Sequence, residues 1–237
     1  MRIGTTIRNC IILGLVIAAP IARAQSSDIP AKLGKVTGTI TFSGTIPEKK
    51  QLQVTKDQKV CGATPIYDES LAVGEKRGLA NVVVFLEGLP KDGATKPMKI
   101  TLDQSGCRYV PHVQAATVGS KLVMKNSDNT FHTVHSYLGS ETMFNVPTVS
   151  HGSMEQVLEE SGPVRLSCDA GHTWMGAWVY VLDHPFFAVT STDGTFVVDG
   201  VPPGVYTVKA WHEKLGLRSG KVKIQPGSSS TLNLSFK

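Results

Sequence analysis

The feature that most constrains the fold of this chain is a long succession of short strand-like segments with almost no helix signal between them. Turn dipeptides such as Asp193-Gly194 and Asp199-Gly200 separate several of them. One stretch, 153–160, fits a short helix as well as a strand. Glycine and proline show no triplet period, which excludes a collagen-like chain. The pattern predicts an all-β fold of two β-sandwiches, with strands at 35–43, 81–87, 98–103, 121–126, 131–136, 155–159, 163–168, 177–183, 186–190, 195–198, 205–212, 221–224 and 231–236.

The first 24 residues have the pattern of a removable export signal. Arg2 and Arg8 precede the apolar run 10–22, and Ala22-Arg23-Ala24 matches a small-residue cleavage site. We expect a mature periplasmic protein that begins at Gln25. The apolar run is shorter than the ~20 residues that span a bilayer, and no other stretch approaches that length, so we expect no membrane span.

The charge balance argues against a nucleic-acid partner. The formal net charge of +5 includes three arginines of the export signal, which contains no acidic residue. The mature chain therefore carries 21 basic and 19 acidic side chains, a net charge of +2. So small an excess predicts neither nucleic-acid nor membrane-surface binding.

The cysteines separate into a pair and a single thiol. Cys10 leaves with the export signal, and three cysteines remain in an oxidising compartment. Cys61 and Cys107 lie beside glycines in polar turn regions, with no histidine at ligand spacing, which favours a disulfide between them. Cys168 ends a strand-like run, and His172 follows four residues later. A free thiol in an oxidising compartment usually has a function, although an inert buried thiol is the alternative.

Two segments resemble the cupredoxin (blue-copper) family, which includes amicyanin and plastocyanin. The first holds an aromatic-x-Pro turn, a glycine, a strand that ends in Asn-x-Asp, and a histidine, at Tyr109-Val110-Pro111-His112, Gly119, Asn126-Ser127-Asp128 and His132. The second is the loop Cys168-Asp169-Ala170-Gly171-His172-Thr173-Trp174-Met175. The resemblance covers residues 98–183 and implies a Greek-key sandwich there.

The resemblance implies a copper site formed by His132, Cys168, His172 and Met175. One thiolate and two imidazoles with a weak axial thioether suit both oxidation states of copper, and the soft thioether favours copper over zinc. Relative to amicyanin, Gly171 adds one residue between the cysteine and the histidine. Two further histidines, His135 and His112, are weaker ligand candidates.

The C-terminal part resembles the prealbumin-like domain of carboxypeptidases. The resemblance rests on Asp193-Gly194 and on the turn Val201-Pro202-Pro203-Gly204-x-Tyr206, while the opening strand of such a domain matches Gly34-Lys35-Val36-Thr37-Gly38-Thr39-Ile40, far upstream. We therefore expect the cupredoxin part to be inserted in, or followed by, this small sandwich. The expected divisions are 1–24, 25–97, 98–183 and 184–237. A similar fusion occurs in proteins labelled as methylamine-utilisation proteins.

The resulting hypothesis is a periplasmic type 1 copper protein that transfers electrons to a redox partner protein and is not an enzyme. The loop 171–177 is short, apolar around its histidine and almost uncharged, which favours a docking patch where His172 meets that partner. One alternative is a copper-handling or delivery protein. Another is a carbohydrate- or partner-binding module centred on the C-terminal sandwich.

Overall fold

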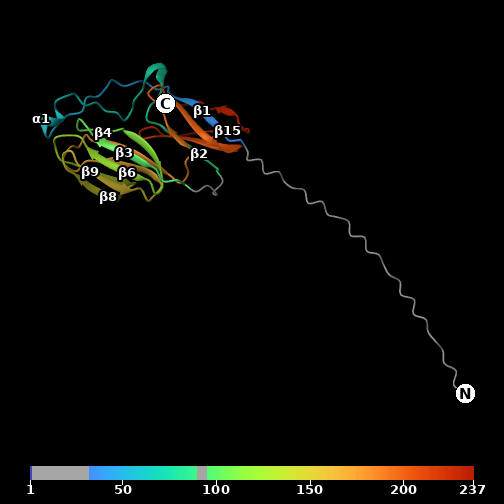
Figure 1. Cartoon of the computed structure of the whole chain (residues 1–237). Coiled ribbons are helices and arrows are strands. Elements are labelled where there is room, and N and C mark those ends of the chain that lie inside the picture. Colours follow the sequence, from blue (N-terminus) through green and yellow to red (C-terminus); the bar gives the residue numbers. More distant parts are fainter. Residues whose placement is uncertain (2–31, 90–94) are drawn as a thin grey trace. The chain divides into compact units, whose positions relative to one another are not determined.

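The structure, a computed structural model, describes Met1 and residues 32–89 and 95–237. The expected export signal therefore lies almost wholly outside the described residues. The chain from Lys32 onward forms one compact unit. It is almost entirely β-structure, which confirms the all-β fold class (Figure 1). Across the described ranges, no helix is both long and apolar enough to cross a membrane.

The strands are short, and the helical segments amount to a few residues. The strands are β1 (Gly34–Phe42), β2 (Val83–Glu87), β3 (Lys99–Gln104), β4 (Tyr109–Val110), β5 (Val113–Thr117), β6 (Lys121–Asn126), β7 (His132–Leu138), β8 (Glu141–Thr148), β9 (Ser153–Val157), β10 (Gly162–Ser167), β11 (Gly176–Leu182), β12 (Phe187–Val189), β13 (Thr195–Val201), β14 (Gly204–His212), β15 (Gly216–Ile224), β16 (Ser229–Thr231) and β17 (Leu234–Phe236). The helical segments are α1 (Gln58–Cys61) and the 3-10 turn η1 (Glu75–Arg77). The ambiguous stretch 153–160 thus contains a strand, β9.

The middle of the chain forms two sheets that we call the inserted sandwich. One sheet has the order β5-β11-β10-β7-β8 and the other β4-β3-β6-β9. Alternating residues of both sheets are buried between them, among them Leu102, Met124, Val134 and Leu166, each with no exposed surface. Period-two alternation explains this core, because successive side chains of a strand point to opposite faces.

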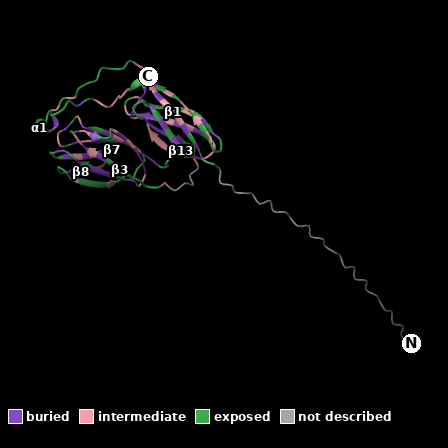
Figure 2. Cartoon of the chain, turned by 45° about the horizontal axis from the view of Figure 1, so that its top comes forward, coloured by how far each residue is buried: buried purple, intermediate pink, exposed green. Residues whose placement is uncertain are grey.

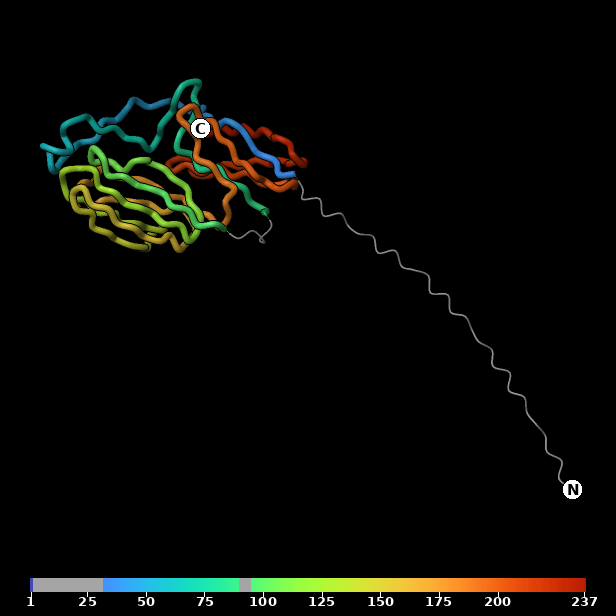
Figure 3. The backbone as a smooth tube through the Cα atoms, viewed as in Figure 1, coloured from blue at the N-terminus to red at the C-terminus, as the bar shows by residue number. Residues whose placement is uncertain are grey.

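Strands from both ends of the chain form a second pair of sheets, the host sandwich. β1 pairs with β13, β16 and β17, and the other sheet has the order β12-β2-β14-β15. In Figure 3 the blue N-terminal strand accordingly lies beside the orange and red C-terminal strands, and the green and yellow strands lie together. Its core includes Ile40, Leu86, Val208 and Phe236, and buried residues follow the strands of both sandwiches (Figure 2).

The two sandwiches pack against each other through aromatic side chains. Phe85 and Trp211 of the host sandwich contact Tyr180 of β11, with ring centroids 5.1 and 5.3 Å from the Tyr180 ring, and Trp178 lies 5.3 Å from Trp211. Since this interface is apolar and well buried, it fixes β11. The loop that leads into β11 is thereby held at its C-terminal end.

Residues 51–67 form a loop that packs on the inserted sandwich. The backbone bridge between Gln51 and Tyr67 closes its base, and the amide of Leu52 donates to the carbonyl of Ile66 at 2.8 Å. Cys61 and Ile66 are buried in the core of the inserted sandwich. We call this loop the cap. The sequence of 51–76 is polar and lacks clear periodicity, and the few apolar side chains of the cap anchor it to the sandwich.

Candidate metal centre

His132 is the first residue of β7 and points into the inserted sandwich. Its neighbour on the same strand face, Val134, is likewise buried. The preceding turn is held by Asn126, whose side-chain amide donates to the carbonyls of Thr130 and Thr148 and whose Oδ1 accepts from the amide of Asp128. The Asn-x-Asp motif therefore fixes the turn that presents His132.

Cys168, His172 and Met175 lie in the loop between β10 and β11. Gly171 has a φ of +89°, a conformation that a glycine adopts at little cost and that allows the extra residue between Cys168 and His172. The amide of Met175 donates to the carbonyl of His172 at 2.9 Å, which closes a tight turn. All three side chains are buried, and Met175 packs in the same core as Cys168.

The structure brings three donor atoms from these two segments into one small triangle. Nδ1 of His132 lies 3.0 Å from Nδ1 of His172, and the sulfur of Cys168 lies 3.9 and 3.6 Å from these two nitrogens. An ion at the centre of this triangle would lie about 2.1 Å from each of the three atoms. Zinc binds imidazole nitrogen at about 2.0–2.1 Å and thiolate sulfur at about 2.3 Å, so the triangle has the size of a metal site. Within the described residues, His132, Cys168 and His172 form a group that could hold a metal ion.

A carboxylate holds the outer nitrogen of each imidazole. Nε2 of His132 lies 3.0 Å from Oδ2 of Asp128, and Nε2 of His172 lies 2.7 Å from Oδ2 of Asp57. Each contact fixes the ring orientation and leaves Nδ1 directed at the triangle. This is the outer-shell arrangement that supports histidine ligands in metal sites.

The surroundings of Cys168 favour its thiolate. Burial raises the pKa of the thiol, but hydrogen bonds from His132, from the Thr133 amide and from His172 outweigh burial and lower the pKa to about 6. Burial lowers the pKa of His132, whereas its hydrogen bonds to Asp128 and Cys168 raise that pKa to about 9. The thiolate is the form in which cysteine binds a metal.

A second group of possible donors contains Asp128, His132 and Cys107. It is not available to an ion, because Cys107 forms a disulfide with Cys61. The pairing of these two cysteines is the one expected from the sequence. The bond joins α1 of the cap to the turn between β3 and β4.

The expectation that His172 itself meets a redox partner in a docking patch is wrong. His172 has no exposed surface. Asp57 of the cap covers its Nε2 edge, and the ring of Trp174 packs against it with centroids 5.2 Å apart. The loop sequence is apolar as noted, but the cap lies over it.

The other two candidate histidines lie outside the triangle. His135 points to the opposite face of β7, where Nδ1 contacts Asp169 at 2.6 Å and Nε2 contacts Thr142 at 2.9 Å. His112 bonds to the carbonyl of Gly176 through Nδ1 and to Glu213 through Nε2. Both rings use their two nitrogens in these contacts.

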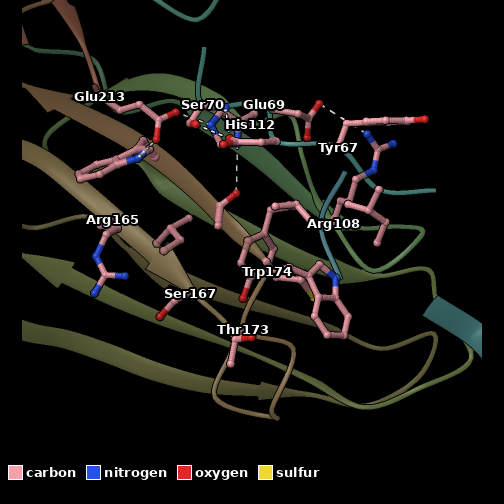
Figure 4. A pocket seen from close by; sticks show the side chains of 18 residues that line it. Tyr67, Glu69, Ser70, Arg108, His112, Arg165, Ser167, Thr173, Trp174 and Glu213 are labelled. Atoms are coloured by element: carbon pink, nitrogen blue, oxygen red, sulfur yellow. Dashed lines mark hydrogen bonds and ion pairs between the residues drawn. The ribbon is translucent and has the colours of Figure 1, made fainter. Parts of the chain in front are cut away.

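A cavity of about 350 Å³ adjoins the loop between β10 and β11. Thr173 and Trp174 line one part of it, and His112 and Glu213 line another (Figure 4). Met175 also lines the cavity. The indole N–H of Trp174 donates to the carbonyl of Cys107 at 3.0 Å. Trp174 therefore separates the buried His172 ring from this cavity.

The contacts of Asp57 with His172 and of Asp128 with His132 were not predicted from the sequence. Asp57 lies in a polar segment without periodicity, so nothing in its neighbourhood indicates a tertiary partner. The one usable signal is Cys61, four residues later, because a disulfide partner restrains the segment around it. Asp128 was visible as the end of the Asn-x-Asp motif, four residues before His132.

Comparisons with known proteins give structural similarities only. No family model matches the sequence, and no curated protein matches it. A copper-containing nitrite reductase from Thermus scotoductus is similar over 37% of this chain, with 21% identity and a TM-score of 0.33, and the match spans 23% of that protein. A purple cupredoxin from Nitrosopumilus maritimus is similar over 35% of this chain and 98% of its own, with 22% identity and a TM-score of 0.31. An amicyanin variant in its reduced state is similar over 35% of this chain and 82% of its own, with 19% identity and a TM-score of 0.32.

Proposed function

We propose that this protein binds one copper ion through His132, Cys168 and His172, with Met175 as the fourth ligand, and acts in electron transfer. The observation that carries the proposal is the triangle of two Nδ1 atoms and one sulfur in a buried position. Bound copper would supply one-electron chemistry at this site. Two imidazoles and a thiolate in a trigonal arrangement, with a weak thioether as the fourth donor, are the set typical of blue-copper electron-transfer sites.

The residues around the triangle suit an ion that stays in place. The Thr133 amide donates to the Cys168 sulfur at 3.4 Å, which steadies the thiolate. Asp128 and Asp57 hold the two imidazoles from outside. Because little of this framework has to move, the reorganisation on a change of oxidation state is small.

The burial of the donor side chains argues against copper delivery. A delivery protein releases its ion by exchange of ligands with a partner, which needs an accessible ligand edge. Both histidine ligands have no exposed surface, and the Cys168 side chain is also buried. A resident ion that exchanges electrons with a redox partner protein fits this closure better, and we propose no enzymatic activity.

The host sandwich supports a scaffold role better than carbohydrate binding. A sugar-binding face needs exposed aromatic side chains. Four aromatic residues of this part, Phe196, Tyr206, Trp211 and Phe236, are each at most 9% exposed. We further propose a periplasmic location, supported by the export-signal pattern of residues 1–24 and by the disulfide.

The test is the absorption spectrum of the copper-loaded protein. Oxidised wild-type protein is expected to show an intense charge-transfer band from the Cys168 thiolate to copper. Cys168→Ser is expected to abolish the band, while Met175→Leu retains it and shifts the reduction potential. Met154→Leu is the matched control, since Met154 is exposed on β9. Absence of the band in loaded wild-type protein would refute the proposal.

A further inference from the structure

The cap makes three separate contacts with the ligand loop and its surroundings. Oδ2 of Asp57 bonds to Nε2 of His172 at 2.7 Å, and Oδ2 also accepts from the hydroxyl of Thr130 at 3.1 Å. The ammonium group of Lys56 donates to the carbonyl of Ala170 at 2.6 Å. These contacts come from two adjacent residues, so one short segment of the cap contacts the His172 ring, the turn before β7 and the backbone of the loop between β10 and β11.

The backbone conformation of Asp57 is uncommon and is held by the cap. Its φ is +50°, in the left-handed region that non-glycine residues seldom adopt. Its carbonyl accepts from the amides of Val60 and Cys61, at 2.9 and 2.8 Å, so the first turn of α1 holds the residue in place. The side chain is about one-third exposed, whereas the ring it contacts is fully buried.

The disulfide connects the supports of both histidines. On one side, the Cys61 amide donates to the backbone carbonyl of Asp57. On the other side, the amide of Cys107 donates to Oδ2 of Asp128 at 2.8 Å, and this same oxygen contacts His132. One covalent bond therefore ties the residue that supports His172 to the residue that supports His132.

We propose that Asp57 is a positioning residue for His172 and that the disulfide-anchored cap closes this edge of the metal site. The proposal rests on the function proposed above, because it assigns a role to residues that surround the same three ligands. A carboxylate at Nε2 makes the imidazole a better donor and fixes its orientation. The closed cap also excludes reagents from the shortest route to the donor atoms past His172.

The first test uses metal-free protein and measures alkylation of Cys168 by iodoacetamide. Asp57→Ala removes one carboxylate and no core side chain, and loss of a hydrogen bond to a charged group should accelerate alkylation on the order of tenfold. Asp57→Asn can still accept a hydrogen bond and is expected to show a smaller acceleration. Lys59→Ala, an exposed change on α1, is the matched control and is expected to react at the wild-type rate.

A second variant tests the anchor itself. Replacement of both Cys61 and Cys107 by serine frees the cap and leaves Cys168 as the one cysteine of the mature chain. We expect alkylation faster than in Asp57→Ala. If this double variant does not fold, Asp57→Ala still decides the question. Equal alkylation rates in wild type, Asp57→Ala and Lys59→Ala would overturn the proposal that the cap closes this edge of the site.

The second measurement separates positioning from mere coverage. In copper-loaded protein, Asp57→Asn removes a negative charge near His172, so the ratio of Cu(II) to Cu(I) affinity should fall several-fold and the reduction potential should rise, with the thiolate band retained. An unchanged potential would refute the positioning role. A missing band in wild type would instead refute the copper proposal and leave the alkylation result valid.

Discussion

His212 offers a test of how the host sandwich responds to pH. The residue ends β14, its side chain is buried, and its ring lies 6.1 Å from that of Phe236. Its Nδ1 accepts from the amide of Lys214 at 3.2 Å. Burial lowers the pKa of His212 to about 4; the negative charge of Glu213 opposes this shift, and the positive charges of His112 and Lys214 add to it.

The sign and size of the effect follow from proton binding. An unfolded histidine has a pKa of about 6.5, so between pH 6.5 and pH 4 the unfolded chain binds a proton at His212 that the folded chain does not. The free energy of unfolding therefore falls as the pH falls through this window. A difference of about 2.5 pKa units corresponds to roughly 3 kcal/mol, at 1.36 kcal/mol per unit.

The perturbation is His212→Asn, in which Oδ1 can replace Nδ1 as acceptor. The variant loses packing at every pH but does not titrate. We expect the difference in unfolding free energy between wild type and variant to fall by about 3 kcal/mol from pH 7 to pH 4. Other titrating groups, such as His184, are present in both proteins and cancel in this difference.

The assay is urea unfolding of the metal-free protein at both pH values, followed by tryptophan fluorescence and circular dichroism. A difference between the two proteins that stays constant within about 0.5 kcal/mol from pH 7 to pH 4 would show that burial of neutral His212 costs nothing at low pH. The reasoning about this residue would then be wrong.

Three further predictions concern the framework. Peptide mapping of the non-reduced mature protein should find Cys168 as its one alkylatable cysteine, and a peptide that links Cys168 to Cys61 or Cys107 would contradict this. Replacement of both Cys61 and Cys107 by serine should lower the free energy of unfolding by about 4 kcal/mol, given the separation of 46 residues. Gly38→Ala should cost more than about 2 kcal/mol in urea unfolding, because a Cβ would meet a backbone carbonyl oxygen at 1.8 Å, whereas the control Gly176→Ala, with its nearest atom at 4.0 Å, should cost less than about 1 kcal/mol. Deletion of residues 32–43 should abolish hydrogen-exchange protection in β13 and β14 but not in β7 and β10, and protection retained in all four strands would argue against a host sandwich that depends on β1.

The strands of both sandwiches were the predictable part of the fold. Apolar residues alternate in segments such as 163–168 and 205–212, which predicts strands with one buried face. The structure has the strands β10 and β14 there. Segment 153–160 was ambiguous because the five residues of β9 are too few to separate a period of two from one of 3.6. The pairing partner of β9, β6, was needed to decide.

The donor atoms were predictable for a different reason from their surroundings. Cys168, His172 and Met175 share one loop, so their proximity follows from sequence spacing alone. Asp57 lies 115 positions from His172, and only the tertiary fold brings them together. The same holds for the partly buried contact of His112 with Glu213, 101 positions away. Sequence spacing therefore indicated the candidate donor residues but not the burial of His172, and the expectation that His172 meets a redox partner failed there.

The pairing of β1 with the last strands sets an order of assembly. Thr37 of β1 pairs with Thr231 of β16, 194 positions later, so a chain synthesised from its N-terminus keeps β1 without these partners until its end appears. Every strand of the inserted sandwich is present once Leu182 has emerged. The two ends of the inserted sandwich lie close together. The carbonyl of Met98 accepts from the amide of Lys121, and the carbonyl of Leu182 accepts from the amide of Val118, three residues before Lys121. Completion of the inserted sandwich therefore shortens the span that the host sandwich must close, which reduces the entropy cost of bringing the two ends of the chain together.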